Sequence, residues 1–100
     1  MNQTSFRTYE LAVELYKECD RIKAKGEIRS QLERATLSSV LNLSEGAAKP
    51  TPADKRRFYA IAYGSIRETQ TILRLLNQAE LFEKADTLGA HAYKLIRQTK

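Results

Sequence analysis

The chain contains few of the residues that build metal centres, disulfides and membrane segments. It has one cysteine, one histidine and no tryptophan among 100 residues. A single cysteine, Cys19, excludes an internal disulfide, and one Cys with one His is too few for a structural zinc site. No apolar run approaches the roughly 20 residues that cross a bilayer, and residues 1–5 do not resemble a signal peptide. We therefore expect no metal, no cofactor, no membrane span and a cytoplasmic location.

Glycine and proline are also scarce, at four and two residues, so few positions interrupt regular structure. No segment alternates apolar and polar residues with a period of two, and no βαβ pattern is present. One hundred residues, of which 42% are hydrophobic, suffice for one modest core. These features predict an all-α fold in a single domain over residues 1–100.

Helical periodicity and punctuation predict four helices, at about residues 6–25, 30–47, 52–79 and 83–98. Gly26 is expected to stop the first helix, and Ser30 with Glu33 forms a capping-box pattern for the second. Thr51 followed by Pro52 is a strong start signal for the third. Short connections favour antiparallel neighbours, so we expect an antiparallel up-and-down four-helix bundle.

A polar stripe follows the second predicted helix. Its members lie within about 80° of one another when the sequence is plotted at 100° per residue. They are Gln31, Arg34, Ser38, Asn42 and Glu45. With Glu68 of the third helix, they suggest either a buried acid/base site or a buried structural network of ion pairs and hydrogen bonds. No nucleophile, metal ligand or phosphate loop accompanies them, which favours the structural network and a protein that is not an enzyme.

The rest of the second helix is apolar over more than one side, and it carries small residues such as Ala35, Ser39 and Gly46. We do not expect a single copy of the chain to cover all of this apolar surface, so we expect a subunit interface there. Gly64 in the middle of the third helix costs about 1 kcal/mol relative to alanine. We expect another helix to approach closely at Gly64, and this packing to offset the cost.

The net charge of +5 is concentrated in one segment. Residues 49–79 hold six Lys/Arg against two Asp/Glu, whereas residues 1–48 are neutral. Arg56, Arg67 and Arg74 lie within about 20° of one another on the helix, beside tyrosines that offer stacking surfaces. The planar guanidinium group of arginine matches the geometry of phosphate, so the segment predicts a nucleic-acid site. The alternative is a solvated helix face. The candidate residues are Lys49, Lys55, Arg56, Arg57, Tyr59, Tyr63, Arg67 and Arg74.

A series of motif residues runs through the second and third helices. It comprises Gln31-Leu32-Glu33-Arg34-Ala35, Ser38, Asn42-Leu43-Ser44-Glu45-Gly46, Phe58, Ile61-Ala62, Gly64-Ser65 and Glu68. This series resembles the bacterial four-helix-bundle proteins encoded within intervening sequences of 23S ribosomal RNA genes. The resemblance implies a ring-like homo-oligomer, a pentamer, without catalytic activity. More distantly, the chain resembles accessory proteins of diversity-generating retroelements, which pair with a reverse transcriptase and nucleic acid.

Two functions from different classes fit these observations. The first is an oligomeric RNA- or DNA-binding module that uses the basic face of the third helix. The second is a protein-interaction scaffold or accessory subunit, in which the second helix builds the ring and the basic face meets an acidic partner protein. Salt dependence separates them, because release of counterions from a nucleic acid gives a steep dependence of affinity on salt.

Overall fold

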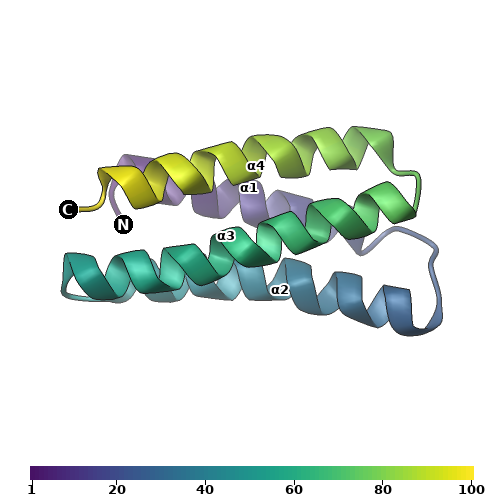
Figure 1. Ribbon diagram of the computed structural model, residues 1–100, viewed down its shortest axis with the longest axis horizontal. Helices are drawn as coiled ribbons and strands as arrows, with labels where there is room; N and C mark the ends of the chain where they lie inside the picture. The colour runs from purple at the N-terminus through teal and green to yellow at the C-terminus, as the bar shows by residue number, and fades with distance from the viewer.

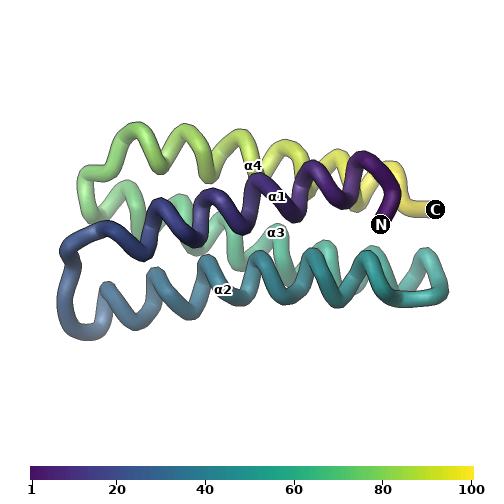
Figure 2. The backbone as a smooth tube through the Cα atoms, turned by 180° about the vertical axis from the view of Figure 1, so that it is seen from behind, coloured from purple at the N-terminus to yellow at the C-terminus, as the bar shows by residue number.

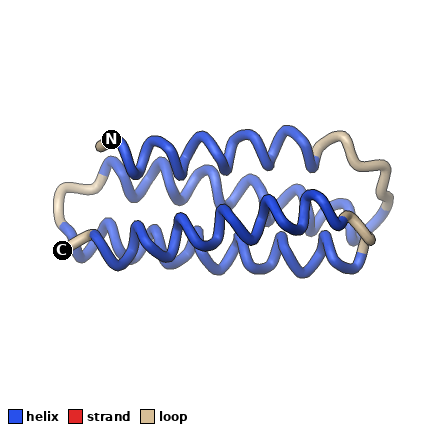
Figure 3. Tube along the Cα trace, turned by 90° about the horizontal axis from the view of Figure 1, so that it is seen from above, coloured by secondary structure: helices blue, strands red, loops and turns tan.

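The structure, a computed structural model, describes residues 1–100 and contains four α-helices and no strand. The helices are α1 (Gln3–Cys19), α2 (Gly26–Ala48), α3 (Pro52–Leu75) and α4 (Ala79–Gln98). Figure 1 shows the chain turning back after each helix, with α1 and α4 in one half of the molecule and α2 and α3 in the other. Both termini lie at the same end, and short loops join the helices (Figure 3). The prediction of an all-α chain with four helices is confirmed.

The connection between α1 and α2 differs from the prediction. Helix α1 ends at Cys19, and α2 already begins at Gly26, which has a φ of 69°. The Arg29 guanidinium explains the early end of α1, because it donates to the carbonyls of Cys19 (3.3 Å) and Ile22 (3.0 Å). These carbonyls therefore need no further helical turn. The predicted capping box at Ser30 is wrong, since Ser30 lies inside α2.

The connection between α3 and α4 is also shifted. Helix α3 has 24 residues instead of the 28 expected, and α4 begins four residues earlier than predicted. Asn77 adopts a left-handed φ of 58°. The amide of Gln78 donates to the carbonyl of Leu73 at 2.9 Å, and that of Asn77 donates to Arg74 at 3.1 Å. These two bonds form a Schellman motif with asparagine in the position where glycine is commoner, and this ends the helix.

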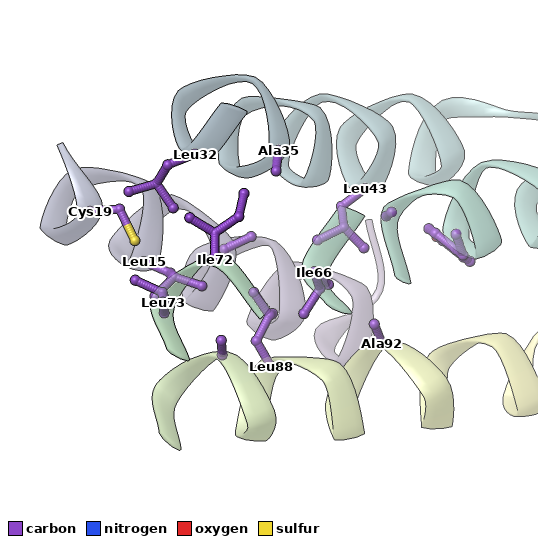
Figure 4. Packing of buried hydrophobic residues seen from close by; sticks show 14 of the residues in the cluster. Leu15, Cys19, Leu32, Ala35, Leu43, Ile66, Ile72, Leu73, Leu88 and Ala92 are labelled. Atoms are coloured by element: carbon purple, nitrogen blue, oxygen red, sulfur yellow. The ribbon is translucent and has the colours of Figure 1, made fainter. Parts of the chain in front are cut away.

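The core runs the length of the molecule between the four helices. Figure 4 shows its side chains converging from all sides, among them Leu15 of α1, Leu32 of α2, Ile66 of α3 and Leu88 of α4. Each of these is at most 3% exposed. Burial of one such leucine or isoleucine contributes about 1.5–3 kcal/mol to folding, so this interior fixes how the helices pack. No helix combines the length and the apolar character needed to cross a membrane.

Two glycines on facing helices have opposite environments. A Cβ on Gly46 would lie 2.7 Å from Cε1 of the buried Tyr59, so α3 approaches α2 closely at this point. A Cβ on Gly64 would meet no atom within 4 Å. The close approach expected at Gly64 is therefore not made within this chain, because that residue lies on the exposed side of α3.

Candidate nucleic-acid interface

Four of the predicted cations lie at the N-terminal end of α3 or in the turn just before it, and nearby protein groups hold each of them. Thr51 caps the helix by accepting from the amide of Asp54 at 3.2 Å. Lys55 Nζ donates to the carbonyl of Ala47 at 2.9 Å, which satisfies the C-terminal end of α2. Arg56 Nη1 donates to the carbonyl of Thr99 at 2.8 Å, which joins α3 to the segment after α4. Lys55 and Arg56 therefore contribute to the fold, whatever else they bind.

An aromatic ring organises the other two cations of this end. The Phe58 ring has Lys49 Nζ 4.8 Å and Arg57 Cζ 4.6 Å from its centroid. Lys49 also pairs with Glu45 at 3.3 Å, and Arg57 lies 3.8 Å from Asp54. Because the Arg57 side chain stays 62% exposed, it is the more accessible of the two.

Tyr59 does not belong to the interface. Its side chain is 2% exposed, and its ring fills the space that Gly46 leaves between α2 and α3. Burial raises the pKa of the Tyr59 hydroxyl above its ordinary value. A ring in this position cannot stack on a nucleotide, so the prediction of Tyr59 as a binding residue is wrong.

The centre of the candidate interface lies where α3 packs against α4. The Arg67 guanidinium donates to the Tyr63 hydroxyl (3.1 Å), to the Gln70 amide oxygen (2.6 Å) and to Oδ1 of Asp86 (3.1 Å). A Cβ on Gly89 would lie 2.8 Å from Arg67 Cζ, so the guanidinium rests directly on α4. Arg67 is thus a link between the two helices as well as an exposed cation, with 37% of its side chain accessible.

These contacts also set the ionisation of the groups involved. The hydrogen bond with Tyr63 raises the pKa of Arg67, and the contact with Asp86 adds to this effect. Hydrogen bonds from Gln70 and then from Arg67 lower the pKa of the Asp86 carboxyl. Both groups are therefore charged near neutral pH, and the guanidinium compensates the one carboxylate of this contact.

Helix α4 adds two residues that the sequence analysis did not include. The Tyr93 ring lies 5.9 Å from that of Tyr63 and is tilted by 52°. Arg97 Cζ lies 6.0 Å from the Tyr93 centroid, just as Arg67 Cζ lies 5.0 Å from that of Tyr63. Each helix therefore contributes a tyrosine and an arginine four residues later, and this repeated spacing is the sequence signal that could have revealed them. We call Tyr63, Arg67, Tyr93 and Arg97 the Tyr–Arg cluster.

Arg74 lies at the far end of the same face. None of the six ion pairs in the structure includes Arg74. It borders an open surface pocket of about 300 Å³, which Phe82 of α4 and the polar side chains of Asn77 and Gln78 also line. Arg74 is therefore the predicted arginine with the least involvement in internal contacts.

The polar stripe of α2 separates into three parts. Arg34 donates to the Gln31 amide oxygen at 2.9 Å and pairs with Glu68. The Ser38 and Ser65 hydroxyls lie 2.8 Å apart. Asn42 Nδ2 donates to the Ser38 carbonyl at 2.9 Å.

Glu45 forms the third part, because it pairs with Lys49 and not with Arg34 or Glu68. The side chains of Glu45, Arg34 and Glu68 are 55%, 53% and 41% exposed. The prediction that they form one buried network is wrong, since the stripe follows the outer seam between α2 and α3.

Apolar side chains remain exposed beside this seam. Leu41 of α2 is 56% exposed and Ile61 of α3 is 46% exposed. The contacts between Ser38 and Ser65 place these two residues on neighbouring turns of the paired helices. We call Leu41, Ile61 and the exposed Gly64 the outer α2/α3 surface.

The chain is an all-α protein of four helices with a cationic, aromatic surface between α3 and α4. It belongs to the family described as 23S rRNA-intervening sequence protein, whose profile matches residues 2–99. No curated protein and no solved structure matches the chain. The family predicted from the motif residues is thereby confirmed.

Proposed function

We propose that the protein is a non-enzymatic, RNA-associated binding protein of the cytoplasm that holds nucleic acid on the face between α3 and α4. The observation that carries this proposal is the Tyr–Arg cluster, in which two helices bring paired tyrosines and arginines to one surface. Arginine combines charge with a planar fork that fits phosphate and stacks on bases. The family description refers to an intervening sequence of 23S rRNA, which favours RNA over DNA as the ligand.

Arg74 and Arg97 are the cations best suited to phosphate. Arg74 has no ion pair, and the only side-chain partner of Arg97 is the Tyr93 hydroxyl at 3.4 Å. Arg67 stands between them and is partly committed to Asp86. Contacts of this kind supply affinity without reading sequence, so we expect binding to many unrelated RNAs.

We also propose that the monomer is an antiparallel up-and-down bundle that assembles into a homo-oligomer, with a five-membered ring favoured by the family resemblance. The reversals of the chain in Figure 2 support the antiparallel order. The outer α2/α3 surface supports the assembly, because Leu41 and Ile61 expose apolar area beside a glycine that leaves room for another helix. A particle mass of 11.4 kDa at micromolar concentration in light scattering would contradict the assembly.

The binding proposal is tested by titrating a labelled RNA at several salt concentrations. Arg74→Gln with Arg97→Gln should weaken binding about tenfold at low salt and make the plot of log affinity against log salt shallower by roughly one to two units. Arg7→Gln with Arg21→Gln removes the same charge from residues outside α3 and α4, so it serves as the matched control.

The outcomes distinguish the alternatives. Equal weakening by the two double variants would show that the face between α3 and α4 is wrongly assigned. Absence of binding by the wild-type protein at low salt would contradict the proposal and favour the scaffold that meets an acidic partner protein.

A further inference from the structure

We propose that Tyr93 is a stacking platform for an unpaired base, so that the ligand of the face between α3 and α4 is single-stranded RNA. This inference rests on the proposed function and names the class of nucleic acid that the face selects. Tyr93 is the starting point because half of this large aromatic side chain is exposed to solvent, at 50%.

The ring is supported from behind and open in front. Tyr63 contacts it at a centroid distance of 5.9 Å, and the Tyr63 hydroxyl accepts from Arg67. Arg67 is in turn anchored on Asp86 of α4. The Tyr93 ring is thus positioned by a chain of contacts across both helices, which reduces the conformational entropy lost when a base stacks on it.

The surroundings leave space for a base. One turn before Tyr93 on α4 stand Ala90 and Gly89, of which Gly89 is covered by the Arg67 guanidinium, and one turn before Tyr63 on α3 stands Ala60. Ala60 and Ala90 are exposed and carry only a methyl group. The preceding turns thus place no large side chain beside the Tyr93 ring. Arg97 on the following turn lies over the ring, 6.0 Å from its centroid, and its only side-chain hydrogen bond goes to the Tyr93 hydroxyl, so a base that stacks on Tyr93 displaces a single exposed arginine.

Positive charges lie on both sides of the Tyr93 ring, where the phosphates of an RNA strand would continue beyond the stacked base. Arg97 lies on one side of Tyr93, and Arg67 and Arg74 follow on the other along α3. Tyr63 and Arg74 are 11 residues apart, which corresponds to about 16 Å of helix at 1.5 Å per residue. The Asp86 carboxylate between them is paired with Arg67 and accepts a hydrogen bond from Gln70, so its charge does not interrupt the path of a phosphate backbone.

The preference for single strands follows from base stacking. Base pairs inside a duplex are already stacked on both faces, whereas an unpaired base can stack on an exposed aromatic ring. One such stack contributes enough affinity that its loss weakens binding roughly tenfold or more. A duplex would contact this surface through its phosphates alone, and Tyr93 would add nothing to its affinity.

The experiment compares fluorescein-labelled 12-nucleotide oligo-adenosine with a labelled 12-base-pair RNA duplex in anisotropy titrations. Tyr93→Leu should weaken binding of the single strand about tenfold and leave duplex binding unchanged, whereas Tyr93→Phe should keep the affinity of the wild type. Phe6→Leu is the matched control, because Phe6 is an aromatic residue of α1 with 53% exposure. Thermal unfolding of each variant checks that the fold is retained.

The failures can be told apart. If the wild type binds RNA but Tyr93→Leu binds the single strand equally well, or loses single strand and duplex in parallel, the stacking inference is overturned and the binding proposal stands. If the wild type binds neither probe at low salt, the binding proposal itself fails, and the stacking inference fails with it.

Discussion

The two sides of α3 differ in chemistry. Toward α4 the helix presents Tyr63 and Arg67, whose partners are an aromatic ring, a carboxylate and the bare backbone at Gly89. Toward α2 it presents Ser65 and Ile61, beside a serine hydroxyl and an exposed leucine. The proposed RNA binding and the proposed assembly therefore use opposite sides of one helix and do not overlap.

This difference also shows that net charge alone is a poor guide to a binding face. Segment 49–79 holds six cations, yet Lys55 and Arg56 donate to backbone carbonyls and Lys49 pairs with a glutamate. The accessible positive charge lies partly on α4, at Arg97, which is outside that segment. The arrangement of the helices therefore decides which cations can meet a ligand.

The largest expected effect is on assembly. Leu41→Glu with Ile61→Glu places two charges on the outer α2/α3 surface, and burying them against another copy would be costly. We expect association to weaken at least a hundredfold, about 3 kcal/mol, and the particle mass to fall toward 11.4 kDa in light scattering.

The control for this change is Leu75→Glu, since Leu75 is 67% exposed but lies at the C-terminal end of α3. It should leave the mass unchanged. An intact oligomer in the Leu41/Ile61 double variant would place the interface elsewhere. A loss of RNA affinity at matched monomer concentration would show that the two sides of α3 are coupled.

A smaller effect is expected at two glycines, Gly64 on the outer α2/α3 surface and Gly89 of α4 against Arg67. Gly64→Ala should stabilise the monomer by up to about 1 kcal/mol, because a methyl group there meets no atom within 4 Å and alanine favours the helix. Gly89→Ala should gain less, since its Cβ would press on the Arg67 guanidinium, which must move. Urea unfolding of both variants in the Leu41/Ile61 background measures the difference. Equal gains would mean that Arg67 moves away from Gly89 without cost.

The smallest effect concerns pH. The hydrogen bonds from Gln70 and Arg67 hold the pKa of Asp86 below its ordinary value of about 3.9, so their contribution to stability is present above that value. It is lost as pH falls through the lowered pKa. A carboxyl-detected NMR titration should place the Asp86 midpoint below that of a model peptide, and Arg67→Gln should raise it. A midpoint at or above 3.9 in the wild type would contradict the contact between α3 and α4.

The sequence predicts the helices well because their apolar positions repeat at helical spacing and Thr51-Pro52 marks the start of α3. It does not predict the ends of α1 and α3. Arg29 closes α1 from ten residues away, and Asn77 closes α3 by adopting a left-handed conformation that glycine adopts more often. Both helix ends depend on hydrogen bonds and a backbone conformation that the spacing of apolar residues does not reveal.

The candidate site is predicted less completely. Helical angles place Arg56, Arg67 and Arg74 on one face, but they do not say which neighbour that face meets, so Tyr93 and Arg97 were missed. Tyr59 was misplaced because a tyrosine on an amphipathic helix can lie at the edge of the apolar stripe or inside it. The packing of its ring against Gly46, which decides between the two, appears only when both helices are present.

The Ser38–Ser65 hydroxyl pair also restricts how α2 and α3 can align. If α3 slid by one turn, about 5.4 Å, toward its C-terminal end, Ser38 would face the aliphatic Ile61 and its hydroxyl would lose its partner. An unpaired, partly buried hydroxyl costs on the order of 1–3 kcal/mol, which disfavours the slip. The hydroxyl pair thus favours one alignment of α2 with α3. It keeps Leu41 level with Ile61, so that every copy of the chain has the same outer α2/α3 surface.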